Sequence, residues 1–152
     1  MASQDIYAKL KKDHKSVQQI LKKMVGTDEG DAAERRELLK QLKTELLTHA
    51  HAEEKLLYSE LERHKPSHDI ALEAEEEHHV AEYLLQELEN CDVRDQHWKA
   101  KASVLQELLK HHIEEEEKTM FSKAHKVLDK EQEQTMARRF DAQKEKEMRT
   151  LQ

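Results

Sequence analysis

Apolar residues recur along this chain three or four positions apart, which is the spacing of a helix with one buried face. Short polar stretches interrupt this pattern at three places and divide the chain into long segments. The pattern therefore predicts four long helices, over residues 3–26, 31–63, 67–90 and 95–128. Short connections between long helices favour an all-α fold, an up-down-up-down four-helix bundle.

Residues that favour helix ends mark the boundaries of these segments. Ser3 and Ser67 can each accept a hydrogen bond from the first turn of the helix that follows. Asp31 has Glu34 three residues later, which is the pattern of a capping box. Pro66 cannot continue a helix, so it should end the second one.

The charged C-terminal segment is the hardest part of the chain to interpret. Asp129 with Gln132 repeats the capping pattern, but few apolar residues follow. This segment is predicted to be either a short fifth helix or a frayed continuation of the fourth. We therefore divide the chain into a bundle over residues 1–128 and a C-terminal helical extension of the same domain over residues 129–152.

Composition removes several classes of protein. Two glycines and one proline are too few for a β-rich fold, and the 36% of apolar residues suits long helices with narrow apolar stripes. A net charge of -7 with lysines intermixed among glutamates predicts no nucleic-acid partner. No stretch approaches the roughly 20 apolar residues of a membrane span, and the N-terminus lacks the apolar core of a signal peptide. We expect a soluble, cytoplasmic protein with no membrane partner, in which the single Cys91 is a loop thiol.

One ten-residue pattern occurs twice, over residues 49–58 and 112–121. In both copies a histidine is followed by two glutamates, four and five residues later, and by an aromatic residue nine residues later. A simpler histidine segment precedes each copy at a nearly equal distance, at His14 and at His78. This arrangement is an internal repeat of a helical hairpin, and each hairpin supplies two histidines and one glutamate.

Helical spacing separates the histidines that face the core from those that face solvent. His79 shares its face with polar residues, and so does His51, whereas His111 is harder to assign. The histidines near helix ends, at positions 64, 68, 97 and 125, are assigned to the surface. The candidate metal ligands on the apolar stripes are His14, His49, Glu53, His78, His112 and Glu116.

A single histidine four residues before a glutamate means little in a chain with 33 acidic residues. Two matching copies with four inward histidines argue for a metal site, because burying these groups without a partner would cost several kcal/mol. Imidazole and carboxylate ligands suit iron, manganese or zinc, and six of them are too many for one tetrahedral zinc. The donor count therefore predicts two ions, with iron as the natural occupant.

The repeated motifs resemble those of the hemerythrin-like HHE cation-binding proteins, and the similarity extends over most of the chain. It rests on Asp13-His14, on Glu77-His78 and on the two ten-residue copies. The resemblance implies a four-helix bundle around a non-haem di-iron centre, with two iron ions joined by an oxo or hydroxo bridge. It also implies that Glu53 and Glu116 bridge the ions. Relatives carry or sense O2, handle NO or peroxide, or store iron.

One departure from the family pattern narrows the expected function. The O2-carrying hemerythrins have a fifth histidine four residues after the third-helix histidine, and this chain has Glu82 there, a possible further ligand. We therefore expect a metal- and O2-binding protein, more than a dedicated enzyme. It would react with O2, NO or peroxide in sensing, scavenging or iron buffering.

Two alternatives remain open at this point. Glu75-x-x-His78 and Glu76-x-x-His79 match the spacing of ferritin-like di-iron oxidases, which would make the protein a ferroxidase or an iron store. A metal-free helical interaction module is the other alternative, suggested by the charged tail. The sequence leaves the oligomeric state, the protein partners and the physiological small-molecule ligand open.

Overall fold

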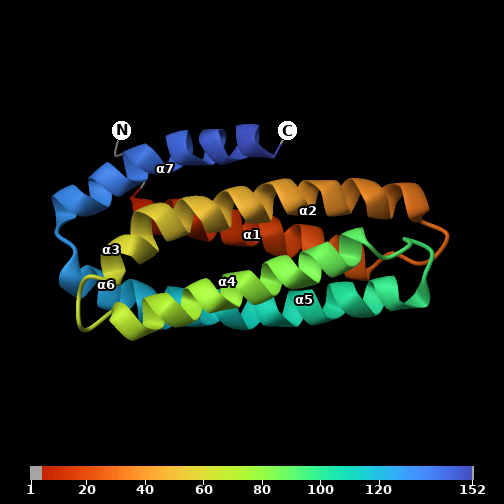
Figure 1. Cartoon of the computed structure of the whole chain (residues 1–152), viewed down its shortest axis with the longest axis horizontal. Helices are drawn as coiled ribbons and strands as arrows, with labels where there is room; N and C mark the ends of the chain where they lie inside the picture. The colour runs from red at the N-terminus through yellow and green to blue at the C-terminus, as the bar shows by residue number, and fades with distance from the viewer. Residues whose placement is uncertain (1–4, 152) are drawn as a thin grey trace.

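The computed structural model describes residues 5–151, which fold into a helical bundle (Figure 1). The bundle is formed by four helices, α1 (Ile6–Val25), α2 (Ala32–Glu53), α4 (His68–Glu89) and α5 (Gln96–Glu115). Within the bundle, each of these helices packs against two of the others, so that α1 lies between α2 and α5, and α4 lies between the same two helices. The predicted all-α bundle is confirmed, and chain neighbours are also neighbours in space because their connections are short.

Two of the long helices continue through a wider, π-helical turn. In the first, η1 (Glu54–Tyr58) follows α2 and leads into α3 (Ser59–Leu61); in the second, η2 (Glu116–Met120) follows α5 and leads into α6 (Phe121–Val127). These turns occur at equivalent places in the two repeats. The sequence pattern predicted a continuous helix at both places and gave no sign of the turns. A π turn inserts one extra residue into a helix and changes the direction of the side chains that follow, and such turns are frequent at functional sites.

The core consists of two apolar clusters, one towards each end of the bundle. The first contains Leu10, Leu57, Ala74 and Met120 among others, and the second contains Val17, Leu46, Ala81 and Leu109 among others. Along α1, for example, the chain passes from Leu10 in the first cluster to Val17 in the second. The interval between these clusters is the layer into which the predicted ligands fall.

The C-terminal segment forms a full helix, α7 (Lys130–Thr150), which packs along α2 and α1 (Figure 1). The predicted capping box is present, with Asp129 and Gln132 exchanging hydrogen bonds. Met136, Ala137 and Phe140 are buried against the bundle. At 21 residues the helix is longer than the short extension that its low apolar content suggested, because the three buried apolar residues fall on the side that meets the bundle.

The other predicted helix starts were only partly right. Asp5 caps α1 and Asp95 caps α5, whereas Ser3 lies outside the described residues. Asp31 does stand before α2, but its carboxylate accepts a hydrogen bond from the Asp28 N–H, so the expected capping box is absent. Ser67 stands before α4, but its hydroxyl donates to the carbonyl of Leu61. In both corrections the side chain bonds to the preceding turn and not to the following helix.

Arg35 joins the two loops at the end of the bundle far from α3 and α6. Its guanidinium is buried and donates to the Thr27 hydroxyl, the Thr27 carbonyl and the Val93 carbonyl. It also lies over the ring of Trp98, 4.6 Å from the ring centroid.

None of the helices in the described part of the chain has the length and apolar character needed to cross a membrane.

Candidate metal centre

The six predicted ligands converge in the layer between the two apolar clusters. His14 comes from α1, His49 and Glu53 from α2, His78 from α4, His112 from α5, and Glu116 begins η2. All six side chains are buried, with no residue more than 4% exposed. The sequence repeat explains this convergence, because each hairpin places its histidines and its glutamate at the same depth of the bundle.

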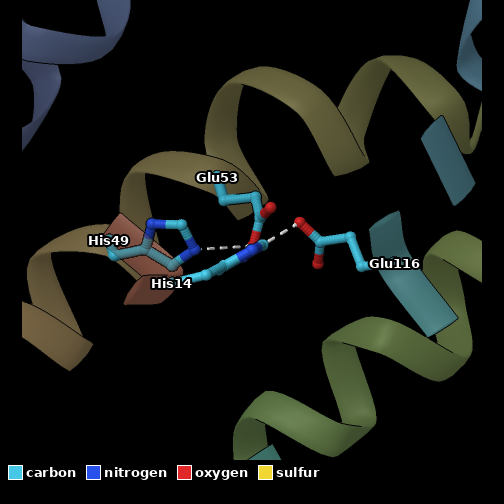
Figure 2. Close-up of side chains that lie close together, drawn as sticks. All are labelled: His14, His49, Glu53 and Glu116. Carbon is cyan, nitrogen blue, oxygen red and sulfur yellow. Dashed lines mark ion pairs between the residues drawn. The ribbon is translucent and has the colours of Figure 1, made fainter. Parts of the chain in front are cut away.

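These residues form two overlapping groups of potential metal ligands. One contains His14 and His49, and the other contains His78 and His112; both include Glu53 and Glu116. Within each group the ligand atoms lie within 4.8 Å of one another. Figure 2 shows the first group, in which His49 faces Glu53 and His14 faces Glu116. Two carboxylates shared between two pairs of imidazoles are an arrangement that suits two ions.

The imidazole Nε2 atoms all point towards the two glutamates. The separations between Nε2 and the nearest glutamate oxygen are 3.5 Å for His14, 3.4 Å for His49, 3.3 Å for His78 and 3.1 Å for His112. Most of these contacts are too long for good hydrogen bonds. The donor atoms therefore surround a common space without satisfying one another.

Five buried polar atoms of this layer have no hydrogen-bond partner among residues 5–151. They are Nε2 of His14, Nε2 of His49, Oε1 and Oε2 of Glu53, and Oε1 of Glu116. Leaving buried polar groups unpaired costs about 1–3 kcal/mol each, and more for charged ones. A divalent cation accepts electron pairs from imidazole nitrogen and carboxylate oxygen, so it would satisfy all five atoms. The donor set thus fits a metal better than it fits a self-contained polar core.

A second layer of carboxylates holds the other nitrogen of each imidazole. In each case the Nδ1–H donates to a carboxylate, so Nε2 is the ring nitrogen that faces inward and can bind a metal once it has lost its proton. The four pairs, at 2.8–3.0 Å, are His49 with Asp13, His112 with Glu77, His78 with Glu54 and His14 with Glu117. Such outer carboxylates fix the orientation of a ligating imidazole and increase its basicity.

These four carboxylates were not assigned a role from the sequence, although the repeat contains the signal. In both hairpins an acidic residue immediately precedes the first histidine, and a second glutamate immediately follows the inward one. The acidic residue before one histidine binds the other histidine of the same hairpin, as Asp13 next to His14 binds His49. In each pair of glutamates, the first is therefore a candidate metal ligand and the second holds a histidine from outside. From the sequence pattern alone, the second glutamate looks like an ordinary solvent-exposed residue.

The glutamates alter the protonation of the metal-free centre. Burial alone would lower the pKa of His49, but the nearby charge of Glu53, together with the hydrogen bond and the charge of Asp13, raises that pKa to about 10. Burial also opposes protonation of His112, whose hydrogen bonds with Glu116 and Glu77 nevertheless raise its pKa to about 10. At neutral pH, His49 and His112 are therefore imidazolium ions paired with buried carboxylates in the metal-free centre.

Tyr58 breaks the symmetry of the two repeats at this centre. Its fully buried hydroxyl donates to Oε2 of Glu116 at 2.6 Å and lies 3.4 Å from Nε2 of His78. The equivalent aromatic of the second repeat is Phe121, which has no hydroxyl. The two aromatic residues occupy equivalent positions in the repeated motif, but only Tyr58 can donate a hydrogen bond to the centre.

A Tyr58→Phe variant should lose about 2 kcal/mol of unfolding free energy in its metal-free form, because a buried hydrogen bond to a charged acceptor is removed. Urea unfolding would measure this loss. Tyr7→Phe is the matched control, since the Tyr7 hydroxyl donates to Glu133 at the same 2.6 Å distance but in a partly exposed place. Water can replace the lost bond at Tyr7, so that variant should lose less. Equal losses would contradict a special role for the buried bond.

Glu82, the further ligand candidate, lies apart from the six buried residues. Its carboxylate accepts a hydrogen bond from Nε2 of His51 at 2.7 Å, and it belongs to neither of the two overlapping groups. Both partners are about one third exposed, because Glu82 lies on the edge of α4 that faces α2. His79 and His111 are exposed, so the division of histidines by helical face agrees with their placement.

Comparison with known proteins agrees with this geometry. The family model for the hemerythrin HHE cation-binding domain matches residues 5–124. The fold is similar to the crystal structure of a hemerythrin HHE cation-binding domain-containing protein from Mycobacterium kansasii, with a TM-score of 0.83 and 20% sequence identity. That similarity covers 97% of this chain and 89% of the other. A search of curated proteins gave no match. Because the family model matches well over half of its length, the chain belongs to the hemerythrin HHE cation-binding domain family.

Proposed function

We propose that this protein binds two iron ions and reacts with O2, NO or peroxide in the cytoplasm, in sensing, scavenging or iron buffering. His14 and His49 would hold one ion, His78 and His112 the other, and Glu53 and Glu116 would be shared between them. The observation that carries the proposal is the set of five buried, unpartnered donor atoms facing one space. Bound iron would supply an open coordination position and the electrons for binding or reducing a small oxidant.

The surrounding residues would control what reaches the ions. Apolar clusters on both sides exclude bulk water from the layer. A narrow crevice of about 10 Å³ opens between Glu73, Glu77 and Glu115 and reaches His112 and Glu116. A cavity of this size holds roughly one water molecule. The crevice therefore admits a diatomic molecule or peroxide more readily than an organic substrate.

The balance of ligands favours small-molecule binding over the oxidation of organic substrates. Four imidazoles and two carboxylates give less negative charge than a carboxylate-rich site, so the high-valent iron that would attack an organic substrate is stabilised less. Glu75, which a ferritin-like arrangement would direct to the metals, lies instead near Glu54 and His79 at the surface. The interaction-module alternative rested on the tail, whose buried residues are covered by the bundle itself.

Metal analysis of the purified full chain tests the proposal directly. Anaerobic reconstitution with Fe(II), followed by removal of unbound metal, should leave about two ions per chain. Exposure of the reduced protein to air should cause a single change in its visible absorption spectrum, with no further change afterwards. A chain without bound iron would contradict the proposal. Repeated turnover of added Fe(II) with mineral formation would support the ferritin-like alternative.

A further inference from the structure

Lys144 connects the C-terminal helix to the candidate metal centre. Its ammonium group donates to both carboxylate oxygens of Asp13, at 2.8 and 2.9 Å. Asp13 in turn accepts a hydrogen bond from Nδ1 of His49 at 2.9 Å. The ring of Phe140, one turn earlier on α7, stands edge-to-face with His49 at a centroid distance of 6.0 Å. One helix outside the bundle thus supports His49 from two sides.

This support is given to only one of the four imidazoles. Among the described residues, Asp13 is the one outer carboxylate that forms an ion pair with a lysine or an arginine. The others are Glu54, Glu77 and Glu117, whose ion-pair partners are the imidazoles alone. The family model ends at residue 124, before α7 begins. The asymmetry therefore comes from a part of the chain that lies outside the matched domain.

We infer that Lys144 is a positioning residue for the ion bound by His14 and His49. This inference rests on the proposed function, since it assumes that the centre binds metal. The Asp13 side chain is 19% exposed, so without Lys144 its carboxylate can turn towards water and release the Nδ1–H of His49. Lys144 holds the carboxylate in the orientation that keeps the Nε2 lone pair of His49 directed at the metal.

Two effects of Lys144 on metal binding oppose each other. Its positive charge repels a cation, but the side chain is 27% exposed, and solvent screens that repulsion. Loss of an outer partner of a ligating histidine typically lowers metal affinity by about 10–100-fold. Positioning should therefore outweigh repulsion, and removing Lys144 should weaken binding.

The chain offers a matched control one turn away. Lys9 of α1 forms an ion pair with Asp141 of α7, so it joins the same two helices without contacting an outer carboxylate. Lys9→Ala and Lys144→Ala should therefore have similar effects on the docking of α7. Only the second variant should change the orientation of Asp13.

Calorimetric titration of Zn2+ into the metal-free full chain tests the inference without any redox step. We expect two binding events in the wild type, one of which is weakened by up to about tenfold in Lys144→Ala, because Asp13 stays in place but loses its support. Lys144→Arg should restore it, and Lys9→Ala should leave both events unchanged. Thermal unfolding of the metal-free variants should show similar small losses for Lys9→Ala and Lys144→Ala.

Several results would overturn the inference. Unchanged or tighter Zn2+ binding in Lys144→Ala would show that Asp13 needs no support. Equal weakening by Lys9→Ala would assign the effect to docking of α7, and equal weakening of both ions would remove the distinction between the two positions. A wild-type chain that takes up no Zn2+ would overturn the proposed site itself, and this inference with it.

Discussion

A Glu53→Ala variant should retain almost none of the iron that the wild-type chain binds. Glu53 belongs to both overlapping groups of ligands, and both of its oxygens are buried without hydrogen-bond partners. Its removal takes one ligand from each ion and leaves His49 and His78 facing an empty space. His49→Ala affects only one group and should leave about one ion per chain. Metal analysis after anaerobic reconstitution distinguishes the two outcomes.

The loss of metal should also lower the stability of the reconstituted protein. A ligand that binds only the folded state stabilises it by RT ln(1 + [L]/Kd), or about 2.7 kcal/mol when the free metal exceeds Kd a hundredfold. Two ions should therefore contribute several kcal/mol, which Glu53→Ala would lose. Glu53→Gln, which keeps the shape but removes the charge, separates the loss of a ligand from the creation of a cavity.

His79→Ala is the matched control for these variants. His79 follows His78 directly, but its side chain is 52% exposed and forms an ion pair with Glu76. This variant should retain two ions and its full thermal stability. If it lost as much iron as His49→Ala, the assignment of inward and outward histidines would be wrong. Retention of one ion by Glu53→Ala would show that Glu53 is not shared.

The fold and the six converging residues could be predicted because both depend on helical periodicity. A residue such as His78 lies on the apolar stripe with Ala81 and Leu85, and burial follows from that stripe. Repetition of the motif then shows that the hairpins place equivalent residues at one depth. The internal repeat thus supplied the tertiary information that periodicity lacks.

The residues that the sequence left unassigned depend on contacts between helices. Asp13 and Glu117 resemble ordinary solvated acidic residues, and only the packing of neighbouring helices brings them to His49 and His14. The docking of α7 depends on three buried apolar side chains in a highly charged segment, too few for a clear stripe. At Asp31 and Ser67 two local hydrogen-bonding patterns compete, and the preceding turn provided the better partner.

The metal-free protein should lose stability as the pH rises, whereas the metal-bound protein should gain it. His49 and His112 have pKa values of about 10 in the folded metal-free chain, because each lies beside carboxylates, Glu53 and Asp13 for His49 and Glu116 and Glu77 for His112. An unfolded histidine has a pKa of about 6.5. Protonation therefore stabilises the metal-free fold fully below about pH 6.5, and this contribution disappears as the pH rises through about 10.

Metal binding reverses this dependence because a metal and a proton compete for the same Nε2 atoms. Each histidine with a raised pKa must release its proton when the ion binds, so the affinity should rise about tenfold per pH unit for each proton released. His49 and His112 lie in different groups, so each ion should release at least one proton between pH 7 and 9. Calorimetry in buffers with different ionisation enthalpies would count these protons.

Asp13→Asn provides the internal check on this mechanism. The hydrogen bond and the charge of Asp13 help to raise the pKa of His49, whereas His112 depends on Glu77 and Glu116. The variant should release fewer protons at the ion bound by His14 and His49, and the same number at the other. Its metal-free form should also lose less stability between pH 7 and 10. Metal binding without proton release at pH 7 would show that the imidazoles are already neutral, and that the glutamates do not hold the metal-free centre as buried ion pairs.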